Sequence, residues 1–214
     1  MAAAPRPDRR RQRTRAALLQ AGRRLFAARS VEAVTIDDIV AEADVAKGSF
    51  YNHFPDKEAL AREVAAEIRK LVEFVAADIN AGVADPAERV ARALVVFVRQ
   101  AGVDPQSVAA SQRLFDAGGV PDAPMNAGVR ADIQAGLAAG RFTDIPLPAA
   151  VLMAVGLVQV GVVRVLQGDQ AAPPRLVARD LAFGLLRGLG LATGEAAAIA
   201  DRAVDTLCGP AAPN

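Results

Sequence analysis

Histidine, cysteine and tryptophan are almost missing from this sequence. Its 214 residues include one histidine, His53, one cysteine, Cys208, and no tryptophan. A single thiol cannot form a disulfide within the chain, and a structural zinc site needs four ligands, so a cysteine framework and a Cys/His zinc cluster are excluded. We therefore expect no metal and no cofactor, and the lone thiol indicates a reducing, cytoplasmic location.

The sequence also lacks a set of residues typical of catalysis. The lone histidine has no second histidine, nearby cysteine or carboxylate cluster that could pair with it. The pair Gly118-Gly119 lies between expected helices rather than between a strand and a helix, so it is not a phosphate-binding loop. We expect no enzyme activity, although a helical enzyme or carrier for a hydrophobic small molecule remains the alternative.

Acidic residues are scarce at the amino-terminal end. The first 24 residues contain eight arginines and one acid, Asp8, and residues 1–60 carry 11 Lys or Arg against 8 Asp or Glu. A basic end suits an anionic partner, with nucleic acid as the first candidate and a membrane surface as the second. We expect residues 1–12 to form a flexible basic arm that adds non-specific affinity, and no secretion signal follows them.

Charge is absent from residues 145–163, a length that approaches a membrane span. Pro146, Pro148, Gly156 and Gly161 interrupt this run, and a span needs roughly 20 apolar residues. A helix that is apolar all round is also what a buried core or a subunit interface requires. The interface is the expectation, and a membrane-surface protein is the alternative.

The rest of the sequence predicts an all-α protein. Aromatic residues make up 4% of the chain and hydrophobic residues 52%, so the apolar share is mainly Ala, Val and Leu. Apolar residues recur at helical spacing and no segment alternates as a strand does. Capping residues, prolines and glycines divide the chain into about ten helices. Two of the start signals are Thr35 with Asp38, a capping box, and Asp85 followed by Pro86.

Two short helices, near 35–43 and 46–53, follow a longer one and are joined by a short turn. This is the helix-turn-helix arrangement, in which the second short helix enters the major groove of DNA. Phe50 and Phe54 are four residues apart and share its buried face. The residues left for phosphates and base edges are Lys47, Gly48, Ser49, Tyr51, Asn52 and His53.

Residues 35–60, which end in FYNHFPDKEAL, closely resemble the DNA-binding domain of the tetracycline-repressor (TetR) family. The resemblance extends back through residues 15–26. It implies an Ω-shaped all-helical homodimer that binds a palindromic operator on double-stranded DNA, represses transcription and is released by a small molecule.

The resemblance also implies roles for single residues. Thr35 caps the first short helix and touches a phosphate, Lys47 and Ser49 face bases or phosphates, Tyr51 and His53 contact the backbone or a base edge, and Lys57 contacts a phosphate. Two positions depart from the family pattern. Asp44 stands where Gly is usual, and Ala46 where Ser or Thr precedes the recognition helix. Asp tolerates the left-handed conformation and could itself cap the helix.

The expected domains are a helix-turn-helix domain at 13–60 and a ligand-binding and dimerisation domain at 61–214. Helices near 149–167 and 174–188 are the expected dimer interface. Most apolar residues of the larger domain should be core. Charged residues are scarce on the same helix faces, which points to a small, largely apolar effector. The candidates for its site are Leu71, Val75, Leu94, Phe97, Phe115, Ile133 and Gln159.

Overall fold

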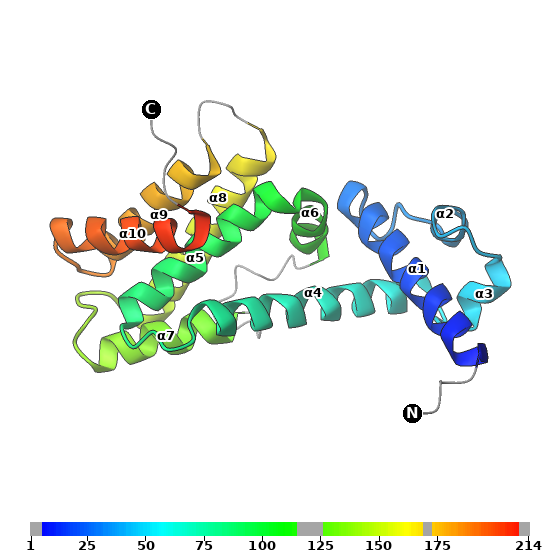
Figure 1. Ribbon diagram of the computed structural model, residues 1–214, viewed down its shortest axis with the longest axis horizontal. Helices are drawn as coiled ribbons and strands as arrows, with labels where there is room; N and C mark the ends of the chain where they lie inside the picture. Colours follow the sequence, from blue (N-terminus) through cyan, green and yellow to red (C-terminus); the bar gives the residue numbers. More distant parts are fainter. Residues whose placement is uncertain (1–5, 115–125, 169–172, 210–214) are drawn as a thin grey trace. The chain divides into compact units, whose positions relative to one another are not determined.

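A computed structural model describes residues 6–114, 126–168 and 173–209, and its regular elements in these ranges are all helices (Figure 1). The expected all-α fold and the expected number of helices are confirmed. The helices are α1 (Arg6–Ala28), α2 (Ile36–Glu42), α3 (Lys47–Tyr51), α4 (Lys57–Ile79), α5 (Pro86–Val103), α6 (Pro105–Leu114), α7 (Ala127–Ala138), α8 (Leu147–Leu166), α9 (Pro174–Gly188) and α10 (Thr193–Cys208).

The chain divides into two compact units, and the boundary lies inside α4, after Lys70. Of the described residues, 6–70 and 106–114 belong to the first unit, and 71–105, 126–168 and 173–209 to the second. The sequence places the functional boundary at residue 60 instead. A compact unit and a functional domain are different divisions, so that boundary stays a prediction.

Helix α1 begins earlier than the sequence suggests. Helix α1 begins at Arg6, so residues 6–12, expected to belong to a flexible arm, are helical. The physical reason is that Arg and Gln are good helix formers and that Pro7 stands in the first turn, where proline is tolerated. The basic side chains therefore extend from a helix.

The first unit is built around the apolar stripes of its helices. Leu18 and Phe26 of α1, Ile39 of α2 and Phe50 of α3 are fully buried. The rings of Phe50 and Phe54 lie 5.9 Å apart, which confirms that the two residues share the buried face. Helix α3 is thus held to the core by its own Phe50 side chain.

The second unit packs around α5, which contacts α7, α8, α9 and α10. Helices α8 and α9 lie side by side (Figure 1). Glycines at the points where they meet allow a close approach. A Cβ atom on Gly161 would lie 2.6 Å from Leu181 Cδ1, and one on Gly188 would lie 2.7 Å from Met153 Sδ. These contacts pair the end of α9 with the start of α8, so the two helices are antiparallel.

An ion-pair cluster joins the start of α5 to α10. The Asp85 carboxylate caps α5 by accepting a hydrogen bond from the Ala87 amide (3.0 Å) and receives two more from Arg141 Nε (3.0 Å) and Nη2 (2.9 Å). Arg141 Nη2 also lies 2.8 Å from Glu195 Oε1. The Arg141 guanidinium, more than the Ala87 amide, holds the pKa of Asp85 below its ordinary value.

We expect Arg141→Ala to lower the free energy of unfolding at neutral pH by about 2 kcal/mol, because it removes charge-assisted hydrogen bonds. Asp85 titrates lower in the folded chain than in the unfolded one, so its contribution is present above pH 4 and is lost as the pH falls through 4 and below. Urea unfolding at pH 7 and pH 3 measures both effects. The gap between unaltered chain and variant should shrink at pH 3, whereas a gap equal at both pH values contradicts the assignment. Arg99→Ala, at an exposed arginine of α5, is the control.

Candidate nucleic-acid interface

Helix α2 begins with the expected capping box. Thr35 Oγ1 accepts a hydrogen bond from the Asp38 amide (3.1 Å), and Asp38 Oδ2 accepts one from the Thr35 amide (3.0 Å). The Thr35 amide, followed by its hydroxyl, lowers the pKa of Asp38. The box satisfies amides at a helix start that have no partner inside the helix. It fixes where α2 begins, next to the exposed Thr35 side chain.

The turn between α2 and α3 depends on Asp44. This residue has a φ of 53°, so it occupies the left-handed region that glycine favours and the expected tolerance of Asp is confirmed. The Val45 amide then donates to the Val40 carbonyl (3.0 Å). Ala46 is the N-cap of α3 and no side chain caps this helix, so the expectation that Asp44 itself caps it is wrong. The Asp44 backbone conformation, rather than its carboxylate, shapes the turn.

Helix α3 has five residues, Lys47–Tyr51, and is shorter than the segment 46–53 that the sequence suggests. The side chains of Lys47, Tyr51 and Asn52 are exposed, and that of Ser49 is partly exposed. The Tyr51 side chain is 53% exposed, although its ring meets the buried Phe50 ring edge-on at 5.5 Å. A Cβ on Gly48 would have no neighbour within 4 Å, so the backbone of α3 is open to approach at this position.

Two basic groups of this region have shifted pKa values. Lys47 Nζ lies 2.8 Å from Asp37 Oδ1, and hydrogen bonding to this carboxylate raises the lysine pKa. Burial, together with the positive charges of Arg11 and Arg15, lowers the pKa of His53 below 6.5. Lys47 is therefore charged and His53 neutral at pH 7. A neutral imidazole offers one donor and one acceptor.

Lys57 has a structural contact that the sequence does not predict. Its Nζ atom donates hydrogen bonds to the carbonyl oxygens of Glu32 (3.0 Å) and Val34 (2.9 Å). These partners lie more than 20 residues away along the chain, so no local sequence pattern predicts the contact. An ammonium group has three donors, and one is left for a phosphate.

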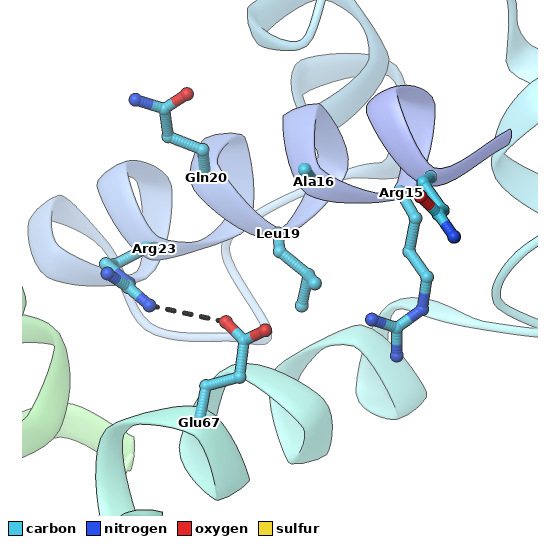
Figure 2. Close-up of a pocket in the computed structure, with 7 residues that line it drawn as sticks. Arg15, Ala16, Leu19, Gln20, Arg23 and Glu67 are labelled. Atoms are coloured by element: carbon cyan, nitrogen blue, oxygen red, sulfur yellow. Dashed lines mark hydrogen bonds and ion pairs between the residues drawn. The ribbon is translucent and has the colours of Figure 1, made fainter. Parts of the chain in front are cut away.

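A groove of about 480 Å³ lies between α1 and α4 within the first unit (Figure 2). Across it, Arg15 Nη2 donates to Glu63 Oε1 (2.7 Å) and Arg23 Nη2 to Glu67 Oε2 (3.3 Å). From the sequence alone, these arginines belong only to the basic amino-terminal end. Their acidic partners lie on α4, more than 40 residues away along the chain. The residues lining the groove are Gln12, Arg15, Ala16, Leu19, Gln20, Arg23 and Glu67.

The effector-site candidates of the second unit differ in how deeply they are buried. Leu94 and Ile133 are fully buried in the core, whereas Leu71 is half exposed. Phe97, Val75 and Gln159 are half-buried, and Phe115 lies outside the described residues. Gln159 Oε1 is buried without a hydrogen-bond partner among the residues that the structure describes. Core packing therefore explains two of the candidates, and the others stay predictions.

Two further observations concern other kinds of site. Within residues 6–114, 126–168 and 173–209, no group of three or more His, Cys, Asp or Glu side chains could hold a metal ion. Helix α8 is long and apolar enough to cross a membrane, with a mean hydropathy of 2.2, but length and composition alone are weak evidence. The core helices of other folds meet the same criterion.

Two protein families match the chain, one at each end. Residues 18–64 match the "Bacterial regulatory proteins, tetR family", and residues 85–202 match the "Tetracyclin repressor-like, C-terminal domain". The HTH-type transcriptional repressor DhaR of Mycobacterium sp. (strain GP1) is 44% identical over 50 residues, which are 23% of this chain and 25% of that protein. The chain thus matches about a quarter of the length of this curated relative.

Solved structures are similar over nearly the whole chain. RolR in complex with resorcinol is 28% identical, with a TM-score of 0.62, and the match covers 91% of this chain and 96% of that one. CprB from S. coelicolor A3(2), a TetR family protein, is 25% identical, with a TM-score of 0.69 over 92% and 98% of the two chains. The helix-turn-helix unit and the helical second unit therefore occur together in both relatives.

Family membership follows from the two matches and the fold together. TetR regulators are soluble proteins that bind DNA operators and small-molecule ligands, typically as dimers, and they are transcription factors rather than enzymes. The carboxy-terminal match alone covers more than half of the chain. This chain belongs to the TetR family of bacterial regulatory proteins, the ligand-responsive, DNA-binding regulators of transcription.

Proposed function

We propose that the chain is a cytoplasmic repressor that binds a palindromic operator as a homodimer and leaves it when a small effector binds. The observation that carries this proposal is the exposed surface of α3, where Lys47, Tyr51 and Asn52 lie beside a glycine with open space around it. Residues 13–60 would bind DNA, and residues 61–214 would bind the effector and the second copy. DhaR, which is 44% identical to this chain over 50 residues, is a repressor.

The DNA contacts divide by chemistry. Lys47, Lys57 and the Thr35 hydroxyl would hold phosphates, because charge and hydroxyl donors position a protein on the backbone of DNA. Gly48, at the start of α3, would let the backbone approach the groove. Base edges would be read by Ser49, Tyr51, Asn52 and His53.

The homodimer is supported by the exposed aliphatic side of α8. Leu152, Val160 and Val163 lie on one face of this helix, and Val160 is 63% exposed. Only 28% of the most apolar 18-residue stretch of α8 is buried inside the chain. A second copy therefore has a large apolar surface to cover. The sequence suggests an apolar stripe on α9 for this interface, made of Val177, Leu181, Gly184, Leu185 and Gly188. This stripe needs a correction, because Leu185 is buried in the core of its own chain while Gly184 is exposed.

The effector would be a small, largely apolar molecule that carries a hydroxyl group. Gln159 Oε1 is a buried acceptor without a donor among the described residues, and such an atom favours a ligand that donates a hydrogen bond. RolR, which is similar over 91% of this chain, binds resorcinol, a benzene ring that carries hydroxyl groups. The other candidates, Leu71, Val75, Leu94, Phe97, Phe115 and Ile133, would supply apolar surroundings.

The test uses the purified chain bound to a fluorescently labelled operator fragment. We expect hydroxylated aromatic compounds to release the DNA, because an effector shifts the equilibrium by its differential affinity for the free and the DNA-bound states. Benzene derivatives without a hydroxyl serve as controls. If compounds with and without a hydroxyl release the DNA equally, the effector does not need a hydroxyl group. If no compound releases the DNA, the effector does not belong to this chemical class.

Lys57 gives a prediction about salt. Lys57→Ala should weaken DNA binding and lower the slope of log affinity against log salt concentration by about one, because one phosphate contact is lost. Fluorescence anisotropy at several salt concentrations measures the slope. If Lys57 only holds the Glu32 and Val34 carbonyls, affinity falls but the slope is unchanged, and the phosphate contact is contradicted.

A further inference from the structure

Helix α9 has one exposed face on which charges of opposite sign stand seven residues apart. Asp180 and Arg187 are both exposed, and seven residues are almost two full helical turns, so the two lie on the same side. The Asp180 side chain is 71% exposed. The exposed residues of this α9 face are Leu176, Asp180, Gly184 and Arg187.

The charges are symmetric about the middle of the helix. The point between Phe183 and Gly184 is equally far from Asp180 and from Arg187. If α9 of a second copy crosses antiparallel at this point, a two-fold axis brings each Asp180 opposite Arg187 of the other copy. Each charge lies about 5 Å along the helix from the axis, so the pairing tolerates the usual range of crossing angles.

Asp180 and Arg187 each keep unused hydrogen-bonding atoms after their contacts within the chain. Asp180 Oδ1 accepts from Arg179 Nη1 at 3.2 Å, while Arg179 Nε donates to Asp201 Oδ1 at 2.8 Å. Arg187 Nη1 donates to the Leu191 carbonyl. The second Asp180 oxygen and the other guanidinium donors remain available. A Cβ on Gly184 would meet nothing within 4 Å, so a second helix has room to approach.

Helix α8 does not offer an equivalent arrangement. Its sequence from 147 to 166 contains Arg164 and no acidic residue. If α9 crossed α8 of the second copy, Arg187 would face no carboxylate on that helix. Contact of α9 with α9 satisfies both charges.

We propose that the second copy docks on this face, with α9 against α9, in the register that pairs Asp180 of each copy with Arg187 of the other. The proposal rests on the homodimer of the proposed function and adds its register. Two reciprocal ion pairs then select an antiparallel α9 pair over slipped alternatives, because a shift by one turn moves both charges away from their partners.

Charge reversal tests the register with the full chain. Asp180→Arg and Arg187→Asp each turn two attractive contacts into two repulsive ones, and should weaken the dimer roughly a hundredfold in analytical ultracentrifugation. The double variant Asp180→Arg/Arg187→Asp restores opposite charges and should dimerise like the unaltered chain. Asp78→Arg, at an exposed position of α4, is the control. Circular dichroism verifies that each variant is folded.

Mixing provides a second readout. The two single variants, purified with tags of different mass and combined, should form more heterodimer in native mass spectrometry than random assortment gives. The reason is that the two positions carry arginines in one variant and aspartates in the other, so every pair across the interface is attractive. Single variants that dimerise normally, or a double variant that stays weakened, overturn the register but leave the regulator intact. An unaltered chain that is monomeric instead overturns the homodimer of the proposed function.

Discussion

Replacing Tyr51 by alanine should weaken operator binding by about 1–3 kcal/mol, or roughly fivefold to 150-fold, while the chain remains as stable as before. The ring is 53% exposed at the end of α3, where it meets the Phe50 ring edge-on. An exposed aromatic residue with a hydroxyl group can contact both a phosphate and the edge of a base. Fluorescence anisotropy with the operator and thermal unfolding of the free protein measure the two effects.

Tyr51→Phe separates the ring from its hydroxyl. If the hydroxyl donates to a phosphate, this variant loses much of the affinity that alanine loses. If the ring alone packs on the DNA, it binds like the unaltered chain. Unchanged affinity in both variants would remove Tyr51 from the interface.

The neighbouring residue should behave in the opposite way. Phe50→Ala should lower the free energy of unfolding of the first unit by about 3–5 kcal/mol, because a fully buried ring is replaced by a cavity. Phe50 contacts the ring of Phe54 and joins α3 to the core, so its loss also releases the recognition helix. DNA binding should therefore disappear together with the folded unit.

Urea unfolding followed by circular dichroism measures this loss, and Phe50→Leu is the matched control. Leucine retains most of the buried apolar surface, so it should cost less than alanine and leave some operator binding. If Phe50→Ala unfolds at the same urea concentration as the unaltered chain, the packing of α3 differs from the one described.

Several helix starts and buried positions were predictable because their signals are local. The Thr35–Asp38 box, the four-residue spacing of Phe50 and Phe54, and the Asp85-Pro86 start each involve neighbours within one or two turns. The start of α1 was not, because the many arginines of residues 6–12 suggest a solvated arm although arginine is a good helix former. Charge and helix propensity are separate properties of the same residues.

Contacts between distant residues were beyond prediction. Nothing near Lys57 indicates that it holds the carbonyls of Glu32 and Val34, and nothing near Arg15 indicates Glu63. The stripe on α9 failed for a related reason. Leu185 and Gly184 both fit an apolar face, and only packing against other helices decides that Leu185 is core. Effector-site residues have the same difficulty, since a core and an apolar pocket use the same side chains.

The most direct test is nuclease footprinting of the purified chain on DNA that flanks its own gene, over a series of salt concentrations and with unrelated DNA as a control. The account predicts protection of one palindromic segment whose half-sites lie about one helical turn, or a multiple of it, apart, since each copy places one α3 in the major groove. Binding should weaken with salt but remain selective for that segment. Equal protection of all fragments would contradict a sequence-specific regulator and leave only the attraction of a basic helix for DNA.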